Sequence, residues 1–365
     1  MTSPTPRPGI MGINPYVGGD SCLKGFDRVL KLSSNEGAFG PSPLAASAYR
    51  DISNTLHLYP DGGMEELRQA IGKVHGLDAQ RIVCGAGSDE LISLLCLAYA
   101  GDGDEVLYSQ YGFLMYAISA KAVGATPVTA PETDLTADVD ALLAAVTDKT
   151  RIVFLANPNN PTGTYLPASD VSRLRQQLPE HILLVIDAAY AEYVTREDYS
   201  EGNALVDLGD NVIVTRTFSK IHGLGGVRLG WAYGPENVID VLNRVRGPFN
   251  VGAAALAAGA AAIQDLDFTK KVRAHNLKWL TWTREQLLEL GLTVTDSVGN
   301  FLLVCFEDHP ERTSDGANEA LKAHGIIVRG MAGYGLPNCL RITIGLEQDM
   351  RDVVDVLRKY MGKNL

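Results

Sequence analysis

The sequence predicts an α/β protein in which a large domain carries a mostly parallel sheet between helices, and a smaller domain is α+β. Two patterns predict this architecture. From residue 81 to residue 220, short apolar segments alternate with helix-like segments, and strands that are apolar at nearly every position are typical of parallel sheets covered on both faces. After Trp231 the alternation gives way to long helical segments followed by short strands. A chain of 365 residues is also longer than one typical core requires.

The first part of the chain precedes this alternation. Residues 1–40 are punctuated by Pro and Gly, and we assign them to an N-terminal arm and a segment of the small domain. A helix is expected over residues 43–52. Another is expected over residues 64–76, where four apolar side chains recur at helical spacing.

Residues 41–250 are assigned to the large domain, and its later elements follow in regular order. Helices are expected at 88–99, 113–124, 138–146 and 169–178. Strands are expected at 81–85, 105–109, 125–130, 151–157, 181–190 and 211–220. Ligands of such sheets bind at the carboxyl ends of the strands, so the residues that follow each strand are the candidates for a site.

Residues 251–365 are assigned to the small domain. A helix expected at 235–245 precedes this boundary. The run 251–263 has mostly small apolar side chains and is too short to cross a bilayer, so we expect a tightly packed internal helix. Further helices are expected at 276–291, 316–325 and 350–361, and strands within 292–306 and at 326–330 and 340–345.

Composition excludes several classes of function. The formal net charge of −11 argues against binding of nucleic acid or of an anionic membrane surface. The seven histidines show no ligand spacing, so no metal site is expected. The five cysteines are scattered without a CxxC pair, which favours reduced thiols in a cytoplasmic protein over a disulfide framework. The first residues do not have the pattern of a signal peptide.

The stretch TRTFSKIHGLGGVRLG, residues 215–230, is the strongest candidate site. Lys220 follows the hydroxyl residues Thr217 and Ser219, and Arg228 comes eight positions later. A buried lysine amine becomes a nucleophile when desolvation or a nearby cation lowers its pKa, and hydroxyls with an arginine suit a phosphate. The pattern indicates a phosphorylated cofactor held as a Schiff base; the alternative is a solvated loop lysine.

Four further residues end or follow strands and would lie at the same edge. Asp187 ends the apolar strand ILLVID, where it either pairs with a protonated pyridine nitrogen or caps a turn, and Tyr190 is placed to donate to a ring hydroxyl. Asn160 lies in the turn NPNNPTG, which its prolines and glycine hold rigid. Phe113 follows the strand EVLYS, where its ring either stacks on a heteroaromatic ligand or belongs to the core.

The segment GAGSDE, residues 85–90, joins a strand to a helix. Backbone N–H groups at such a helix start attract phosphate, and Ser88 is the expected N-cap. The competing interpretation, a GxGxxG dinucleotide fingerprint, fails because Glu90 stands where the third glycine belongs. In the small domain, Arg329 and Arg341 either grip a carboxylate or phosphate or form surface salt bridges.

In chain order, GAGSDE, NPNNPTG, DAAY, TFSK and RITIG resemble the fold type I PLP-dependent aminotransferases along nearly the whole chain. LSSNEGAFGPSP, LYPDGG and TFSKIHGLGGVRLGW are similar to its histidinol-phosphate aminotransferase branch. The resemblance implies a seven-stranded sheet in the large domain, pyridoxal 5′-phosphate (PLP) as cofactor and a homodimer. It also implies conversion of L-histidinol phosphate and 2-oxoglutarate to imidazole acetol phosphate and L-glutamate, in histidine biosynthesis. Alternatives within the fold are an aromatic or broad-specificity aminotransferase and a decarboxylase of a phosphorylated amino acid.

The resemblance also implies a role for each matched residue. Lys220 would bind the cofactor covalently and move the substrate proton, Asp187 would pair with the pyridine nitrogen, and Phe113 would stack on the ring. The ring oxygen would be bound by Tyr190 and Asn160. The cofactor phosphate would be held by Ala86, Gly87, Thr217, Ser219 and Arg228, with Tyr59 reaching across the subunit interface. The substrate would be bound by Tyr16, Asn35, Arg329 and Arg341.

Two positions depart from the family pattern. NEGAFG, residues 35–40, stands where many relatives read NEN-P-x-G, so the resemblance carries over Asn35 but not the residues after it. Tyr111 and Gly112 precede Phe113 where relatives often have Pro-Thr, which leaves Tyr111 as an alternative stacking residue.

Overall fold

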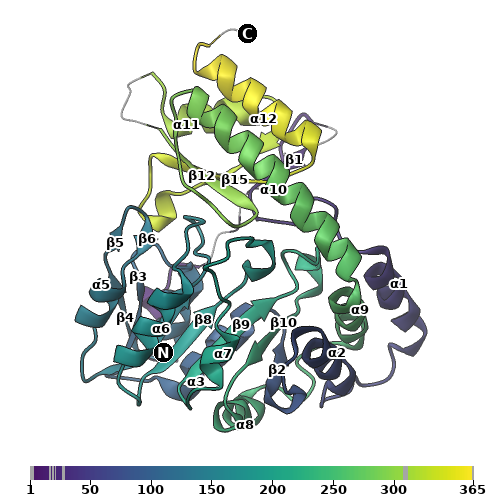
Figure 1. The fold of residues 1–365 in the computed structure, drawn as a ribbon, viewed down its shortest axis with the longest axis vertical. Coiled ribbons are helices and arrows are strands. Elements are labelled where there is room, and N and C mark those ends of the chain that lie inside the picture. Colours follow the sequence, from purple (N-terminus) through teal and green to yellow (C-terminus); the bar gives the residue numbers. More distant parts are fainter. Residues whose placement is uncertain are drawn as a thin grey trace.

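The computed structural model describes residues 4–15, 18, 20, 22–26, 29–306 and 311–363. Its larger lobe is built on a seven-stranded sheet with the order β2-β10-β9-β8-β7-β3-β4 (Figure 1). In this sheet β10 runs antiparallel to β2 and β9, and the pairs from β9 to β4 are parallel. The prediction of a mostly parallel sheet is therefore confirmed. The strands are β2 (Ile82–Gly85), β3 (Glu105–Ser109), β4 (Thr126–Ala130), β7 (Thr150–Ala156), β8 (Leu183–Asp187), β9 (Val212–Thr217) and β10 (Gly230–Tyr233).

Helices cover both faces of this sheet, because successive side chains of a buried strand point to opposite sides and both sets are apolar. One face packs on α3 (Ser88–Tyr99), α4 (Leu114–Ala122) and α8 (Glu236–Val245). The other packs on α2 (Glu65–His75), α5 (Val139–Ala144), α6 (Ala168–Gln177), α7 (Asn203–Val206) and α9 (Ala253–Gln264), with α1 (Pro43–Asp51) against α9. A hairpin of β5 (Glu132–Thr133) and β6 (Thr136–Ala137) lies beside β4 in the chain.

The smaller lobe is built on a four-stranded antiparallel sheet with the order β11-β12-β15-β14. A further pair joins β1 (Leu30–Lys31) in parallel to β13 (Ile326–Ile327), so the segment before α1 contributes to this lobe. The single strand expected over residues 326–330 is wrong, because β13 pairs with β1 while the next strand joins the other sheet. The remaining elements are β11 (Thr293–Val294), β12 (Phe301–Cys305), β14 (Arg329–Gly330), β15 (Cys339–Thr343), α10 (Leu266–Glu289), α11 (Ser314–Lys322) and α12 (Glu347–Tyr360).

Helix α9 packs with the large lobe. Its Ala258 and Ile263 lie in the same apolar core as Leu67 of α2, whereas Trp279 in the following helix belongs to the core of the small lobe. Figure 1 shows α10 running from the side of α9 up to the small sheet. The domain division at residue 250 stays a prediction, and this packing favours a boundary within α10.

Two central strands end earlier than the sequence predicted. The ladder between β8 and β9 stops at the pair Asp187–Thr215, whereas the expected strands continued to residues 190 and 220. Beyond Asp187 the backbone turns, and a short 3₁₀ helix follows at Ala191–Tyr193. Because β8 and β9 both end at the carboxyl edge of the sheet, the residues that follow these strands can converge above that edge.

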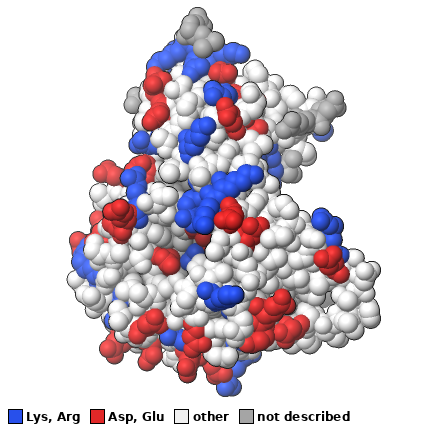
Figure 2. Space-filling view, turned by 45° about the vertical axis from the view of Figure 1, so that its right-hand side comes forward, with Lys and Arg blue, Asp and Glu red and all other residues white. Residues whose placement is uncertain are grey.

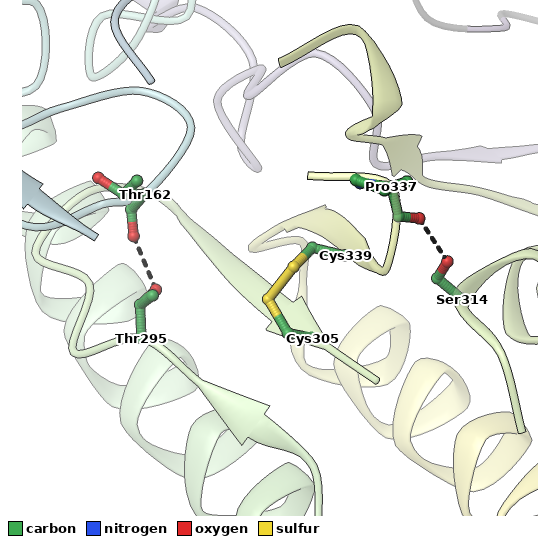
Figure 3. The surroundings of a disulfide bond; sticks show 6 residues. All are labelled: Thr162, Thr295, Cys305, Ser314, Pro337 and Cys339. Atoms are coloured by element: carbon green, nitrogen blue, oxygen red, sulfur yellow. Dashed lines mark hydrogen bonds between the residues drawn. A yellow bond between two sulfur atoms is a disulfide. The ribbon is translucent and has the colours of Figure 1, made fainter. Parts of the chain in front are cut away.

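Cys305 and Cys339 form a disulfide with Cα atoms 4.1 Å apart (Figure 3). The expectation that the cysteines are all reduced is therefore wrong. These residues lie 34 positions apart in the sequence, but the antiparallel register of β12 and β15 sets them directly opposite each other. Figure 3 also shows a hydrogen bond between the lobes near this disulfide, in which the Thr295 hydroxyl donates to the Thr162 carbonyl oxygen over 2.7 Å.

The negative net charge is unevenly distributed over the surface. On the face drawn in Figure 2, acidic and basic side chains mix over the large lobe, and basic side chains gather at the waist below the small one. A few cations can therefore set a positive local potential on an acidic protein. Within the described residues, no helix is long and apolar enough to cross a membrane.

Candidate active site

A cavity of ≈ 370 Å³ lies at the carboxyl edge of the large sheet, and most of the predicted site residues line it. They reach it from the ends of β7, β8 and β9 and from the start of α4, which the sheet order brings side by side. The predicted residues in the wall are Phe113, Asn160, Asp187, Tyr190, Thr217, Ser219, Lys220 and Arg228. Residues separated by more than 100 positions in the sequence thus share one cavity.

Lys220 lies in this cavity with its amine held by the backbone. Its Nζ donates to the carbonyl oxygen of Ser34 over 3.1 Å and lies 5.7 Å from the centre of the Tyr190 ring. Desolvation, reinforced by the positive charge of Arg341, lowers the pKa of the Lys220 amine to about 7. An amine with such a pKa is largely neutral just above neutral pH, as a nucleophile requires.

Asp187 lies at the end of β8, below the same cavity, and is buried. Its Oδ2 accepts a hydrogen bond of 2.7 Å from the Tyr116 hydroxyl, while its Oδ1 has no hydrogen-bond partner among the residues that the structure describes. Burial raises the pKa of Asp187, although the bond from Tyr116 opposes this. A buried carboxylate oxygen without a partner calls for a cationic donor.

Asn35 connects the N-terminal segment to both lobes. Its backbone takes a left-handed conformation with φ of 56°, and its side-chain amide donates to the Tyr190 hydroxyl over 2.9 Å. Its backbone N–H donates to the Thr343 hydroxyl of β15 over 2.9 Å. The predicted substrate residue therefore also orients Tyr190, whose pKa burial raises to about 12.

Asn160 and Arg341 meet across the two lobes. Arg341 Nη1 donates to the Asn160 side-chain oxygen over 2.5 Å, and its Nη2 donates to the carbonyl oxygen of Ser33 over 2.8 Å. Arg329 stands opposite Arg341 in the ladder between β14 and β15, so both predicted arginines lie on neighbouring strands. By contrast, Asn157 and Asn159 of the same turn bond to protein groups around them, to Leu166 and Thr162 among others.

Hydroxyls and an arginine gather at one end of the cavity. Arg228 donates to the Ser219 hydroxyl over 3.3 Å and forms an ion pair of 2.6 Å with Asp89, so a bound phosphate would compete with Asp89 for this guanidinium. Ser88 and Asp89 line the cavity, whereas Ala86 and Gly87 do not. The N–H of Ala86 instead donates to the Glu90 carboxylate over 2.6 Å.

The expected N-cap of α3 is wrong, because the helix begins at Ser88 itself. Gly87 precedes it with φ of 96°, and no side chain caps the helix. Residues with a Cβ atom rarely adopt such a positive φ, so the backbone at this helix start favours glycine.

Phe113 lines the cavity, and its ring packs edge-on against Tyr116 with centroids 5.9 Å apart. Tyr111, the alternative stacking residue, lies outside the cavity wall, with its backbone N–H bonded to Glu132. This arrangement favours Phe113 as the stacking residue.

Tyr59 is 83% exposed and stacks on Phe249 with ring centroids 4.8 Å apart. It does not reach the cavity of its own chain. Tyr16, the remaining predicted substrate residue, lies outside the described residues.

Sequence reasoning missed several residues of the site. Tyr116 was overlooked because a tyrosine in a helix has no distinguishing pattern, although it follows Phe113 by three positions on one helical face. Thr343 was overlooked because it lies in the small lobe, where its hydroxyl accepts from the Asn35 N–H. Ser34 was overlooked because it contacts Lys220 through its backbone carbonyl, which any residue type could supply. Glu36 also lines the cavity, directly before Gly37, where the sequence departs from the family pattern.

The residues present fit a phosphorylated pyridine cofactor. The Asp187 Oδ1 suits a protonated ring nitrogen, and Lys220 supplies an amine of lowered pKa. Thr217, Ser219 and Arg228 supply donors for a phosphate at the end of the same cavity.

Comparison with known proteins identifies the family. The model of aminotransferase class I and II matches residues 27–357. The chain is 64% identical over 362 residues to a histidinol-phosphate aminotransferase of Paramagnetospirillum magneticum, covering 99% of this chain and 100% of that one. It is 60% identical over 359 residues to that of Rhodospirillum rubrum, covering 98% and 97%.

A solved structure agrees with this assignment. Histidinol-phosphate aminotransferase from Sinorhizobium meliloti in complex with pyridoxal-5′-phosphate superposes with a TM-score of 0.85 at 29% identity, covering 92% of each chain. The cavity at the sheet edge, the lysine and aspartate inside it, and these matches over nearly the whole length agree, and the chain belongs to the class I and II aminotransferases.

Proposed function

We propose that this protein is a PLP-dependent aminotransferase that converts L-histidinol phosphate and 2-oxoglutarate to imidazole acetol phosphate and L-glutamate, in histidine biosynthesis. The observation that carries the chemistry is the cavity that holds both the Lys220 amine, with a pKa of about 7, and the Asp187 Oδ1 without a partner. The substrate assignment is supported by full-length relatives at 64% and 60% identity.

Each residue of the cavity has a physical task in this reaction. Bound PLP supplies an electron sink for the pair released at the substrate α-carbon. Asp187 holds a positive charge on the ring nitrogen, and Tyr190 and Asn160 bind the ring oxygen. Lys220, neutral above a pH of about 7, takes the α-proton and returns it. Phe113 covers the ring and limits access of water.

Arg341 and Arg329 would select anionic substrates. Arg341 already lies between Asn160 and Ser33, and a guanidinium binds a carboxylate or a phosphate through two parallel hydrogen bonds. The pair must therefore accept both the phosphate of one substrate and the carboxylate of the other. These two side chains would supply the positive charge that attracts an anionic substrate to an acidic protein.

A substrate panel tests the proposed reaction. We expect amino transfer from histidinol phosphate to 2-oxoglutarate to exceed that from phenylalanine, tyrosine or aspartate. Release of CO₂ without glutamate formation would contradict an aminotransferase and indicate a decarboxylase instead. Faster transfer from phenylalanine or tyrosine would favour the aromatic alternative.

Replacing Arg341 by lysine should weaken substrate binding more than the chemical step. Lysine keeps the charge but loses the bidentate geometry, which costs roughly 1.5–3 kcal/mol, or about 10- to 100-fold in the KM of histidinol phosphate. Steady-state kinetics check this. An unchanged KM with a reduced kcat would contradict direct substrate contact, and Arg351→Lys, on the exposed side of α12, is the control.

We propose a homodimer formed through the surface around α1 and the residues after it. Several large apolar side chains are exposed on this surface, to which Phe249 belongs because it stacks on Tyr59, and such exposure is unfavourable in a monomer. They include Leu44 at 59%, Leu56 at 73%, Tyr59 at 83% and Phe249 at 45% exposed. A partner subunit covering this surface would bring its own Tyr59 toward the phosphate end of the cavity, the role that the family resemblance implies.

Leu56→Glu is expected to convert the dimer to a monomer. A carboxylate buried at a subunit interface without a partner costs several kcal/mol, while the same side chain in the monomer is exposed and tolerated. Light scattering after size exclusion measures the mass. Leu208→Glu changes another leucine, 69% exposed, as a control. A variant that remains dimeric would place the interface elsewhere.

A cytoplasmic location is part of the proposal, as the sequence predicted. The disulfide between Cys305 and Cys339 counts against the reduced cysteines that first suggested this location. The free thiols Cys84 and Cys96 are buried, where burial raises the pKa of each to about 12 and makes it unreactive.

A further inference from the structure

A buried ion pair lies below the active site, on the face of the sheet opposite the α3 layer. Arg216 Nη2 contacts Glu192 Oε1 at 2.8 Å, with side-chain exposures of 3% and 8%. Arg216 belongs to β9, where its neighbours Thr215 and Thr217 point to the other face. In every other described ion pair, at least one of the two side chains is 25% exposed or more. The Arg216–Glu192 pair therefore differs from them in that both of its side chains are buried.

The surroundings keep both groups charged. Burial raises the pKa of Glu192, but the Arg216 guanidinium opposes this and the pKa lies below its usual value. Burial likewise lowers the pKa of Arg216 while Glu192 raises it, with a net rise. The two imidazoles nearby are desolvated: burial lowers the pKa of His75 to about 4 and also lowers that of His222.

The pair leaves hydrogen-bonding capacity unused. Arg216 Nε and Nη1, Glu192 Oε2 and His222 Nε2 are buried without a hydrogen-bond partner in the part of the chain that the structure describes. The guanidinium lies instead 5.4 Å from the centre of the Trp231 ring. A buried ion pair of this kind is a poor source of stability, because apolar residues of the same shape often do as well. Its presence points to a role in holding a specific arrangement.

The pair joins the two segments that carry the cofactor residues. Glu192 follows Tyr190 by two positions and Asp187 by five, in the turn beyond β8. Arg216 directly precedes Thr217 and lies four positions before Lys220, at the end of β9. The ladder between β8 and β9 stops at Asp187 and Thr215, so the ion pair is a side-chain link between these segments beyond the last backbone pairing.

We propose that Arg216 and Glu192 are positioning residues that fix the Asp187–Tyr190 segment relative to the Thr217–Lys220 segment, and so set the cavity to the size of the bound cofactor. The inference rests on the proposed function, because PLP is the ligand that both segments contact. Loss of the pair lets the two segments move apart. Lys220 then becomes more hydrated, and ring and phosphate contacts are no longer satisfied together.

The test uses Glu192→Gln, Arg216→Lys and the double variant Arg216→Met with Glu192→Leu. For the apoenzyme of each, fluorescence quenching gives the dissociation constant of PLP. Acylation of Lys220 as a function of pH, mapped by mass spectrometry, gives the pKa of its amine. We expect Glu192→Gln to raise the dissociation constant at least about tenfold and to raise the Lys220 pKa above its value of about 7. Arg216→Lys should have a smaller effect in the same direction.

The double variant separates positioning from folding. It leaves no unpaired buried charge, so its melting temperature should equal or exceed that of Glu192→Gln, while its PLP dissociation constant should stay raised. A double variant with the wild-type dissociation constant and wild-type Lys220 pKa would overturn the inference, because packing alone would then suffice. Asp207→Asn, which breaks the Arg81–Asp207 pair of 2.6 Å in the same lobe, is the matched control. A wild-type protein that does not bind PLP would refute the proposed function instead.

Discussion

Lys220→Ala is expected to reduce amino transfer by at least about 10³-fold, because general acid–base catalysis by a positioned side chain alone contributes about 10²- to 10⁴-fold. The amine that holds the cofactor and moves the α-proton is then absent, and no other described lysine lines the cavity. Steady-state assay of histidinol phosphate measures the loss. Partial recovery of activity with added small amines would support the assignment, because a free amine can replace the missing base.

The same substitution has a spectroscopic consequence. Borohydride should fix the yellow colour of the wild-type protein onto Lys220, and the variant should lose its colour on dialysis. Lys121→Ala, which changes a lysine bonded to the carbonyl oxygen of Gly12, should remain yellow. Colour fixed to any other lysine would contradict the role of Lys220. Because the pKa of the amine is about 7 and the neutral form attacks, PLP should attach faster as pH rises through that value.

Asp187→Asn is expected to cause the second large loss of activity. The amide has nearly the same shape but cannot carry the negative charge that stabilises a protonated ring nitrogen. Removing one partner of a buried charge pair costs about 3–5 kcal/mol, which at 1.36 kcal/mol per tenfold predicts a loss of about 10²- to 10⁴-fold in kcat. Single-turnover measurement of α-proton removal would report this step directly.

Stability distinguishes this effect from a folding defect. Burial raises the pKa of Asp187, so its ionised form is unfavourable in the apoprotein, and the asparagine removes that cost. The melting temperature of the apoprotein should therefore be unchanged or higher, while the increase in melting temperature on adding PLP should shrink. An apoprotein that melts much earlier, or a kcat close to wild type, would contradict the ring-nitrogen role. Asp207→Asn serves again as the control.

The order of elements could be predicted from sequence because it depends on local patterns. Apolar runs of strand length identified the strands of the large sheet, and helical spacing identified α2, α3 and α12. The site residues at strand ends followed from one rule, that ligands bind at the carboxyl edge of a parallel sheet. Lys220, Asp187 and Asn160 were found in this way and lie in one cavity.

What failed was the pairing of distant segments. Cys305 and Cys339 carry no spacing that predicts a disulfide, since only the register of β12 and β15 places them opposite each other. The strand expected at 326–330 is divided between two sheets, because its first half pairs with β1 from near the other end of the chain. At GAGSDE the structure shows the N–H of Ala86 bonded to Glu90, a contact with no signal in the sequence, and the phosphate role of Ala86 and Gly87 stays a prediction.

By itself the sequence determined the kind of layers, the order of the strands along the chain and the side chains that stand at their ends. Periodicity and turn chemistry are properties of residues that are close in sequence, so they do not depend on how distant segments pack. The tertiary structure alone decided which of those side chains meet. Tyr116 reaches Asp187, Asn35 orients Tyr190, and Arg341 contacts Asn160 across the lobes. It also decided the charge state of Lys220, because a pKa of about 7 comes from desolvation and from cations brought close by folding.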